Sequence, residues 1–205
     1  MNKEALYKLS YGLFVLTACQ NEKDNGCIIN TATQLSSNPN RISIAVNKNN
    51  FTHDMISETR KFTLSVISEE AEFELIKRFG FQSGRDADKF AGFEGFRRGA
   101  NGAAIITEGT NAYLSAWVEQ CIDVGTHTLF IAQMTDADVL SGVPSATYQY
   151  YQDHIKPVKA GKTSDGKTIW RCRICGYEYV GDELPQDFIC PICKHPAEDF
   201  EKIKA

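Results

Sequence analysis

Apolar and β-branched residues recur in short runs, separated by turn-forming residues, over the first 155 positions of the chain. Such runs are typical of strands, whereas helical spacing is confined to four segments. The predicted strands cover residues 11–20, 27–32, 41–47, 62–68, 103–107, 112–124 and 127–135, with a hairpin turn at 21–26. The predicted helices cover residues 2–9, 53–60, 69–79 and 146–155. Because strands dominate without regular βαβ alternation, we expect a mainly β protein, an antiparallel barrel with a few helices.

The pattern changes after residue 155. Residues 156–168 combine four Lys with Gly, Pro, Ser and Thr and lack apolar periodicity, which is typical of an extended linker. Residues 169–205 form a short segment that is rich in cysteine. We therefore predict a large domain over 1–155, a flexible linker over 156–168 and a small second domain over 169–205.

Four of the seven cysteines lie in the last 36 residues, as two Cys-x-x-Cys pairs separated by fourteen residues. These four are Cys172, Cys175, Cys190 and Cys193. Two such turns can direct four sulfurs inward, and a tetrahedral four-thiolate site suits zinc or iron. The spacing predicts a metal site, and by itself it leaves open a zinc ribbon that only stabilises the fold.

The residues around the cysteines favour iron. Aromatic side chains surround both pairs, at Trp170, Tyr177, Tyr179, Phe188 and Phe200. A dry shell tunes a one-electron iron couple, whereas zinc has no redox use for it. With Cys-x-x-Cys-Gly-Tyr followed by Cys-Pro-x-Cys, residues 169–202 resemble rubredoxin, although the middle loop at 176–189 is shorter than in the commonest rubredoxins. The resemblance implies one iron atom.

Composition and charge restrict the partners. The chain has 205 residues, 42% of them hydrophobic, and a net charge of −4, so it can bury a real core and has no overall attraction for nucleic acid. We find no run of eighteen apolar residues and no convincing signal peptide. The other cysteines, Cys19, Cys27 and Cys121, are scattered and do not form a disulfide framework. We expect a cytoplasmic protein without nucleic-acid or membrane partners.

Three polar segments of the large domain are candidates for binding a cofactor. Residues 30–40 concentrate hydroxyl and amide groups, and residues 47–54 follow an apolar strand and open a helix that Thr52 can cap. Residues 79–90 form a glycine-containing loop. The basic side chains in the last two segments are Lys48, Arg85 and Lys89. Lys48 lies where a phosphate would meet helix N–H groups, so the three segments together suggest a phosphorylated aromatic cofactor.

Five runs in this part of the chain are similar to the flavin reductase and flavoredoxin family. They are YGLFVLT, DNGCIINTATQLS, IAVNKNNFTHDMI, KRFGFQSGRDADKF and GTHTLFIA, within about residues 5 to 152. The resemblance implies an FMN-binding split β-barrel that forms a homodimer. It also implies FMN contacts from Asn30, Thr31, Thr33, Gln34, Ser36, Asn47, Lys48, Asn49, Thr52, His53, Ser83, Arg85, Lys89 and Phe90. His53 and His127 are the implied catalytic residues, with His127 facing the nicotinamide; Thr126 stands where many relatives have an acid.

As a whole, the chain resembles the high-molecular-weight rubredoxins of anaerobes. This resemblance implies an oxidoreductase that passes electrons from NADH or NADPH through FMN to iron. It also implies a final protein acceptor, a flavodiiron protein that reduces nitric oxide or dioxygen. Two alternatives remain: a flavin reductase that releases reduced flavin and carries a structural zinc, and a redox-sensing binding module. No GxGxxG motif follows a strand, so the sequence does not choose between the two nicotinamides.

Overall fold

The computed structural model describes residues 5, 8–157, 168–174 and 176–203. The chain divides into two compact units, Met1–Lys156 and Pro157–Ala205. Most of the predicted first helix at 2–9 and of the predicted linker at 156–168 lies outside the described residues. As predicted, the described part of the chain is mostly strand, with few helices.

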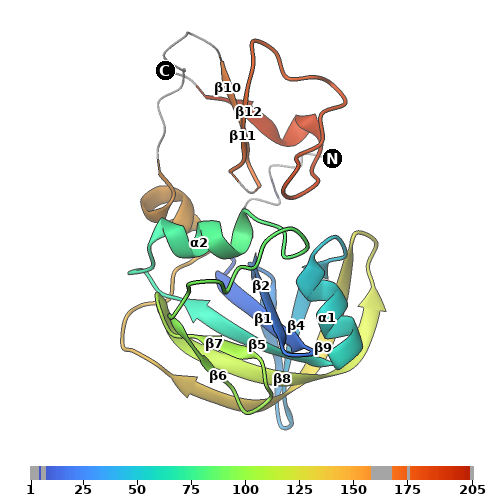
Figure 1. Ribbon diagram of the computed structural model, residues 1–205, viewed down its shortest axis with the longest axis vertical. Coiled ribbons are helices and arrows are strands. Elements are labelled where there is room, and N and C mark those ends of the chain that lie inside the picture. The colour runs from blue at the N-terminus through green and yellow to red at the C-terminus, as the bar shows by residue number, and fades with distance from the viewer. Residues whose placement is uncertain (1–4, 6–7, 158–167, 175, 204–205) are drawn as a thin grey trace. The chain divides into compact units, whose positions relative to one another are not determined.

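A single antiparallel sheet forms the framework of the first unit. Its strands are β1 (Phe14–Gln20), β2 (Lys23–Ile29), β3 (Ala32–Ser37), β4 (Asn40–Asn47), β5 (Lys61–Ile67), β8 (Thr110–Asp123) and β9 (His127–Val139). They are arranged in the order β2-β1-β5-β8-β9-β4-β3 (Figure 1). The long β8–β9 hairpin occupies the middle of this order and joins the two halves of the sheet.

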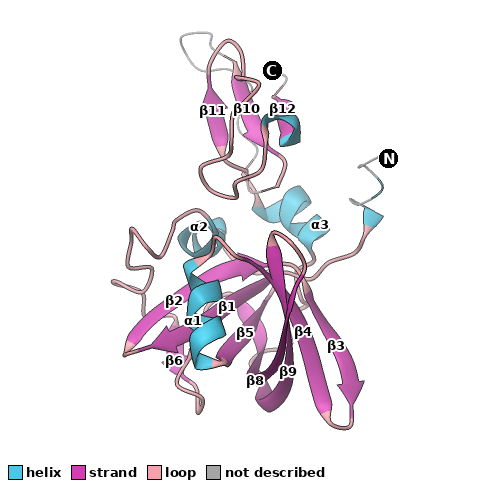
Figure 2. Cartoon of the chain, turned by 90° about the vertical axis from the view of Figure 1, so that its right-hand side faces the viewer, coloured by secondary structure: helices cyan, strands magenta, loops and turns pink. Residues whose placement is uncertain are grey.

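The sheet has to curl because β2 and β3 lie at its opposite edges and only Asn30 and Thr31 connect them. Such a link spans roughly 11 Å at most. In a flat sheet, six strand spacings would separate the edges by about 29 Å. The two edges therefore meet at this corner and diverge elsewhere, as in a barrel that is split along one side (Figure 2).

Helices and a short hairpin cover the sheet. They are α1 (Phe51–Thr59), α2 (Phe73–Gly80), α3 (Tyr148–Tyr150) with its π-helical continuation Tyr151–Ile155, and the hairpin of β6 (Phe96–Arg98) and β7 (Ala104–Ile106). Successive residues of a strand face opposite sides, so Leu16 joins one apolar core and Val15 the other. α1 contributes Met55 and Ile56 to the first core, and α2 contributes Phe79 to the second.

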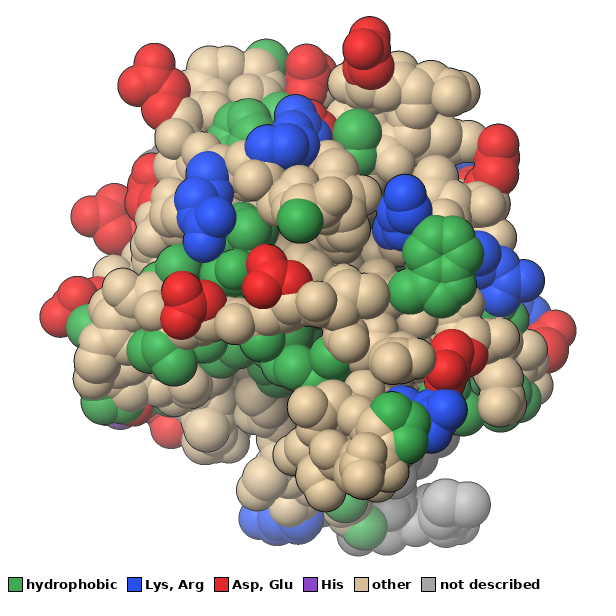
Figure 3. All heavy atoms as spheres, turned by 90° about the horizontal axis from the view of Figure 1, so that it is seen from below, with side chains coloured by type: hydrophobic (Ala, Val, Ile, Leu, Met, Phe, Trp, Pro, Cys, Tyr) green, Lys and Arg blue, Asp and Glu red, His purple; other side chains and the backbone are tan. Residues whose placement is uncertain are grey.

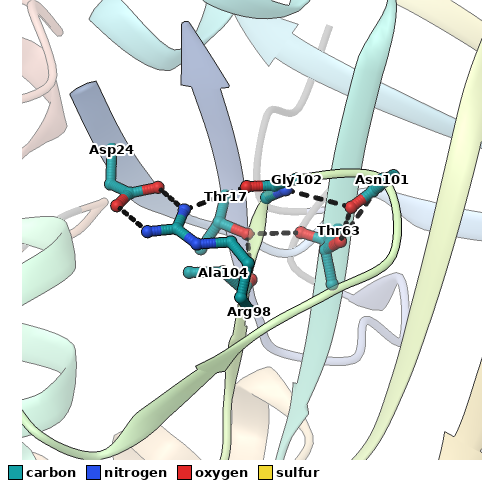
Figure 4. A network of polar contacts seen from close by, with 8 residues as sticks. Thr17, Asp24, Thr63, Arg98, Asn101, Gly102 and Ala104 are labelled. Carbon is teal, nitrogen blue, oxygen red and sulfur yellow. Dashed lines mark hydrogen bonds and ion pairs between the residues drawn. The ribbon is translucent and has the colours of Figure 1, made fainter. Parts of the chain in front are cut away.

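A polar network that is buried only in part fastens the β6–β7 hairpin to the sheet (Figure 4). The Thr17 hydroxyl donates to the carbonyl of Ala104, and Arg98 forms a two-point ion pair with Asp24. The Asn101 amide donates to a β5 carbonyl at 2.9 Å. Thr17 is fully buried, so its hydroxyl serves the hairpin backbone where water cannot reach.

Three local predictions for this unit were wrong. The predicted turn at 21–26 is limited to Asn21 and Glu22, whose φ angles of 49° and 62° produce a tight turn, so β2 begins at Lys23. The polar segment at 30–40, which the predicted strands exclude beyond residue 32, contains strand β3, and its polar residues lie on an exposed edge strand. Thr52 does not cap α1: Asn50 is the N-cap residue, without a side-chain cap bond, and Thr52 is fully buried.

The second unit is a small three-stranded sheet in the order β11-β10-β12. Its strands are β10 (Ile169–Cys172), β11 (Glu178–Val180) and β12 (Phe200–Lys202), preceded by the 3₁₀ turn Ala197–Asp199. Cys172, Cys190 and Phe200 form its buried centre. Within the described residues of both units, every helix is too short or too polar to span a bilayer.

Candidate functional site

Three of the four predicted metal ligands meet in the small unit. The sulfur atoms of Cys172, Cys190 and Cys193 lie within 4.8 Å of one another, and the Cys172 and Cys193 sulfurs are 3.5 Å apart. In a tetrahedral site with metal–sulfur bonds of about 2.3 Å, sulfur atoms are separated by roughly 3.8 Å, so the three sulfurs fit a thiolate-bound metal. Cys175, the fourth predicted ligand, lies outside the described residues.

The predicted aromatic shell surrounds these sulfurs. Tyr179 and Phe188 have ring centroids 4.8 Å apart, and Phe188 meets the edge of Phe200 at 5.3 Å. The sulfur-bearing residues Cys172 and Cys190 are 0% exposed. A metal held here would therefore be shielded from water on the side of the aromatic core.

A second set of predicted residues meets where β4 ends and α1 begins. Asn47 pairs with His127 across β4 and β9, and the N–H of Lys48 donates to Thr126 O at 3.1 Å. The Lys48 ammonium lies 2.7 Å from a carboxylate oxygen of Asp123, and this contact lowers the pKa of Asp123. The cation predicted to bind phosphate is thus paired with a carboxylate from the β8–β9 hairpin.

The two predicted catalytic histidines lie on different faces of β9. Nε2 of His53 is 2.9 Å from the Thr128 hydroxyl, and Nδ1 is 3.1 Å from Asp54. His127, which contacts the Thr126 hydroxyl at 2.8 Å, precedes Thr128 in the strand, so its side chain faces the opposite side. Both ring nitrogens of His53 are engaged, which suits a residue that positions α1 against β9.

Asp54 connects this region to the loop at 83–90. One carboxylate oxygen contacts His53 and the other accepts from Arg85. Burial alone would raise the pKa of Asp54, but hydrogen bonds from His53 and Arg85 outweigh it and lower the pKa. The Arg85 guanidinium also lies over the ring of Phe51, 5.2 Å from its centroid. α1 and the loop are therefore held together by charge-assisted contacts.

The loop forms one wall of a cavity of about 620 Å³. Residues 21–24 of the β1–β2 hairpin, residues 84–88 and Phe90 line it. Arg85 and Phe90 are the predicted site residues that face this cavity, whereas the hydroxyl of Ser83 accepts from the backbone N–H of Arg85. Phe90 packs on its other side against the second apolar core, with its ring centroid 5.4 Å from that of Phe79.

Lys89 is a structural anchor in this structure. It is 4% exposed, and its ammonium donates to the carbonyls of Gly26 and Phe79, both at 2.8 Å. Burial lowers the pKa of Lys89. The ammonium is thus directed between β2 and α2, which differs from the open loop position that the sequence suggested for Lys89.

The predicted residues of the first polar segment are spread along β3. The Thr31 hydroxyl donates to Ala45 O at 2.7 Å, near the Asn47 end of β4, and Thr33 pairs with Ser43 in the middle of that strand. Ser36 lies beyond a bulge and donates to Pro39 O at 2.6 Å. Ser36 is paired with the start of β4, six residues or roughly 20 Å from the Asn47 end, which places it apart from the other candidates.

The remaining predicted side chains take local roles. The backbone N–H of Asn49 donates to Asn47 Oδ1 at 2.9 Å, and the buried hydroxyl of Thr52 accepts from Asn25. Asn30 lies partly buried in the β2–β3 link, and Gln34 is exposed next to the bulge. Among the described residues, sequence reasoning missed Asn25, Asp54, Asp123 and Thr128. Asp123 precedes a Gly in a hairpin turn, and that turn was the available signal.

Comparison with known proteins gives consistent matches for both units. Residues 6–159 match the flavin reductase like domain, and residues 170–201 match the rubrerythrin, rubredoxin-like domain. The chain is 36% identical over 231 residues to the high molecular weight rubredoxin of Moorella thermoacetica, covering 99% of this chain and 100% of that protein. It is also 39% identical over 170 residues to a ferric-chelate reductase (NAD(P)H) of Archaeoglobus fulgidus, covering 83% and 98%.

A solved structure supports the fold of the first unit. The NADH:FAD oxidoreductase of Streptomyces globisporus superposes with a TM-score of 0.63 at 21% sequence identity. The match covers 70% of this chain and 84% of that one. At this identity the likeness establishes the fold, which is the split barrel expected from the sequence.

Proposed function

This chain belongs to the flavin reductase like family and carries a rubredoxin-like domain, and on that premise we propose that it is an NAD(P)H-dependent oxidoreductase. Electrons would pass from the nicotinamide to FMN in the barrel, then to one iron in the cysteine cluster, and finally to a protein acceptor. The observation that carries the proposal is the cluster of three sulfurs, within 4.8 Å of one another, on a chain whose other unit is a flavin reductase barrel.

The surroundings of the sulfurs support iron. Cys172 and Cys190 are fully buried against aromatic rings, and low solvent exposure tunes the potential of a tetrathiolate iron. The iron would supply one-electron chemistry, which suits a flavin that accepts electron pairs and releases single electrons. Cys172, Cys190 and Cys193 would hold it, with Cys175 as the expected fourth ligand.

For the flavin, the proposed phosphate contact is Lys48, at the end of β4 and beside the first turn of α1. An ammonium and helix N–H groups together favour an anion, and Asn47 and Asn49 add amide groups at the same corner. Thr31 and Thr33 would face the polar edge of the flavin from the neighbouring strand. His127 would contact the nicotinamide, on the sheet face that it shares with Asn47.

Apolar residues exposed on the barrel support the proposed homodimer. Ile122 is 43% exposed and Val124 is 53% exposed, at the end of β8 and in the following turn. On the face shown in Figure 3, apolar groups lie between interspersed acidic and basic side chains. A second copy covering Ile122 and Val124 would bury them beside the proposed flavin site. Light scattering should give twice the chain mass, and Ile122→Lys should reduce it more than Val139→Lys does.

The acceptor is proposed to be a flavodiiron-type protein that reduces nitric oxide or dioxygen. The proposed location of both proteins is the cytoplasm of an anaerobe. Residues 170–203 carry four basic and seven acidic side chains. A partner with a basic docking face would be steered toward this unit, and salt would weaken the encounter.

Metal analysis and a visible spectrum of the purified protein test the proposal. We expect close to one iron per chain, a red ferric absorption that a reductant bleaches, and FMN that survives a desalting column. Stoichiometric zinc in several preparations would favour the alternative of a flavin reductase with a structural knuckle. Release of FAD instead of FMN on denaturation would correct the identity of the flavin.

A further inference from the structure

The first cysteine turn of the small unit is closed by two backbone hydrogen bonds. The N–H of Gly176 donates to Cys172 O at 2.9 Å, and the N–H of Cys172 donates to Tyr177 O at 2.8 Å. Gly176 adopts a φ of 79°, a left-handed conformation that glycine reaches without a steric penalty.

The second turn repeats these bonds residue for residue. The N–H of Lys194 donates to Cys190 O at 3.0 Å, and the N–H of Cys190 donates to His195 O at 2.8 Å. Lys194 therefore occupies the position that Gly176 occupies in the first turn. The two halves of the metal site are equivalent in backbone but differ at this side chain.

Lys194 adopts this position against its backbone preference. Its φ is 61°, and in the left-handed region the Cβ of an L residue crowds the following carbonyl. Glycine would satisfy the same hydrogen bonds without that crowding. Residues held in disfavoured backbone conformations are concentrated at functional sites, so the side chain of Lys194 is a candidate for a role at this one.

The Lys194 side chain places a positive charge on the second turn. Its ammonium donates to Pro191 O at 3.0 Å, so the chain folds back along the turn that carries Cys190 and Cys193. Cys193 is partly exposed, whereas Cys172 and Cys190 are fully buried. The ammonium is therefore held against the backbone of the second cysteine turn, which carries the partly exposed Cys193.

Other cations of this unit are engaged differently. Arg171 forms an ion pair with Glu178 at 3.1 Å, and the Lys202 ammonium lies over the ring of Trp170. Among the residues that the structure describes, no carboxylate forms an ion pair with Lys194. In a unit rich in acidic residues, Lys194 is a cation that is not neutralised by direct pairing and that adjoins the metal site.

We propose that Lys194 is an electrostatic tuning residue of the metal centre and favours the reduced state of the bound iron. The inference rests on the proposed function, because zinc has no one-electron couple. Four thiolates give a net charge of about −1 with ferric iron and about −2 with ferrous iron, so a nearby cation stabilises the reduced form more. Because Lys194 is exposed, solvent screening limits the effect to about two- to fivefold in the ratio of reduced to oxidised protein.

The test is an anaerobic redox titration of the intact protein, followed by the ferric absorption, for the parent and three variants. At a fixed applied potential, Lys194→Gln and Lys194→Gly should both lower the ratio of reduced to oxidised iron, by similar factors. Lys194→Arg keeps the charge and should match the parent. A Lys194→Gln variant with the ratio of the parent, or a Lys194→Arg variant that behaves like Lys194→Gln, would overturn the proposal.

Thermal unfolding of the same variants separates charge from backbone strain. Lys194→Gly should raise the unfolding midpoint of the metal-loaded small unit, whereas Lys194→Gln should leave it near that of the parent. A lower midpoint for Lys194→Gly would contradict the strain argument. If the parent itself shows stoichiometric zinc and no ferric band, the proposed function fails. If iron is present but its ratio of reduced to oxidised protein does not change in the Lys194 variants, only the tuning role is overturned.

Discussion

The candidate metal centre and the candidate flavin site are assembled in different ways. The described sulfurs lie within residues 172–193, and each cysteine turn is closed by backbone bonds to its near neighbours. The barrel site instead joins residues far apart in the chain: Lys48 meets Asp123 and His53 meets Thr128, each pair 75 positions apart. A local site can be identified from spacing, whereas a site built by strand pairing depends on a register that spacing does not reveal.

This contrast predicts that damage to the metal centre stays within the small unit. Cys193→Ser removes one sulfur from the cluster and should cause most of the iron to be lost, because structural tetrathiolate sites need all four ligands. Reduction of the flavin by NADH should continue at the rate of the parent, while electron delivery to an external protein acceptor fails. Stopped-flow flavin bleaching and a steady-state acceptor assay measure the two steps.

Two outcomes would contradict this separation. If Cys193→Ser delivers electrons onward as fast as the parent, the metal is not on the path and the flavin itself is the donor. If flavin reduction also collapses, the two units share a site and cannot be treated as independent.

In the barrel, a residue remote from the chemistry should matter for the whole site. Lys89→Ala leaves the carbonyls of Gly26 and Phe79 without their buried donor and opens a cavity, at a cost of about 2–4 kcal/mol of unfolding free energy. Lys77→Ala is the matched control: its exposed pair with Glu74 is worth about 0.5 kcal/mol or less. Urea unfolding measures both, and equal stabilities would show that Lys89 is not an anchor.

The proposed phosphate contact predicts a smaller, localised effect. Lys48→Ala removes a charge-assisted contact of about 1.5–3 kcal/mol and should weaken FMN binding about ten- to a hundredfold, with the iron absorbance unchanged. Free flavin fluorescence at equilibrium measures the affinity, and Lys61→Ala, another exposed lysine of the barrel, is the control. Unaltered retention would move the phosphate to another cation, of which Arg85 is the next candidate.

Substitution of Asp123 should have a weak effect of opposite sign on the affinity for FMN. Its carboxylate forms an ion pair with the Lys48 ammonium in this structure, so it competes with a phosphate for the same cation. Both side chains are solvent-exposed, and we expect Asp123→Asn to tighten FMN binding only about two- to fivefold. The same fluorescence titration measures it, and riboflavin, which lacks the phosphate, should show no gain. Weaker FMN binding by Asp123→Asn would indicate that the ion pair shapes the site.

The same contrast explains what the sequence could predict. The cysteine spacing and the aromatic residues around it predicted the cluster of sulfurs that the structure brings together, because every element of that cluster lies within a short segment. The strand pattern predicted a mainly β barrel, since alternation and turn residues are local signals. The overall resemblance to rubredoxin-linked flavin reductases was confirmed by relatives that match both units.

The details of the barrel site were harder to predict from the sequence. Most of β3 is missing from the predicted strands, because polar residues on both faces of this exposed edge strand hide the alternation. Lys89 has the sequence context of a surface loop, and only the fold shows that α2 and β2 provide its carbonyl partners. Thr52 precedes the helical pattern in the sequence, yet the helix begins earlier and turns this hydroxyl into the core. Each error concerns a side chain whose partner lies in a distant segment.

An anaerobic stopped-flow experiment on the intact protein can follow electron transfer from the nicotinamide through the flavin to the iron. NADH or NADPH is mixed with oxidised protein, and the flavin band and the ferric thiolate band are followed together. If the flavin passes its electrons to the iron, the flavin band should bleach first and the iron band should follow in the same chain, without added mediator. A flavin that is reduced while the ferric band persists, or a protein that has no ferric band at all, would contradict this transfer.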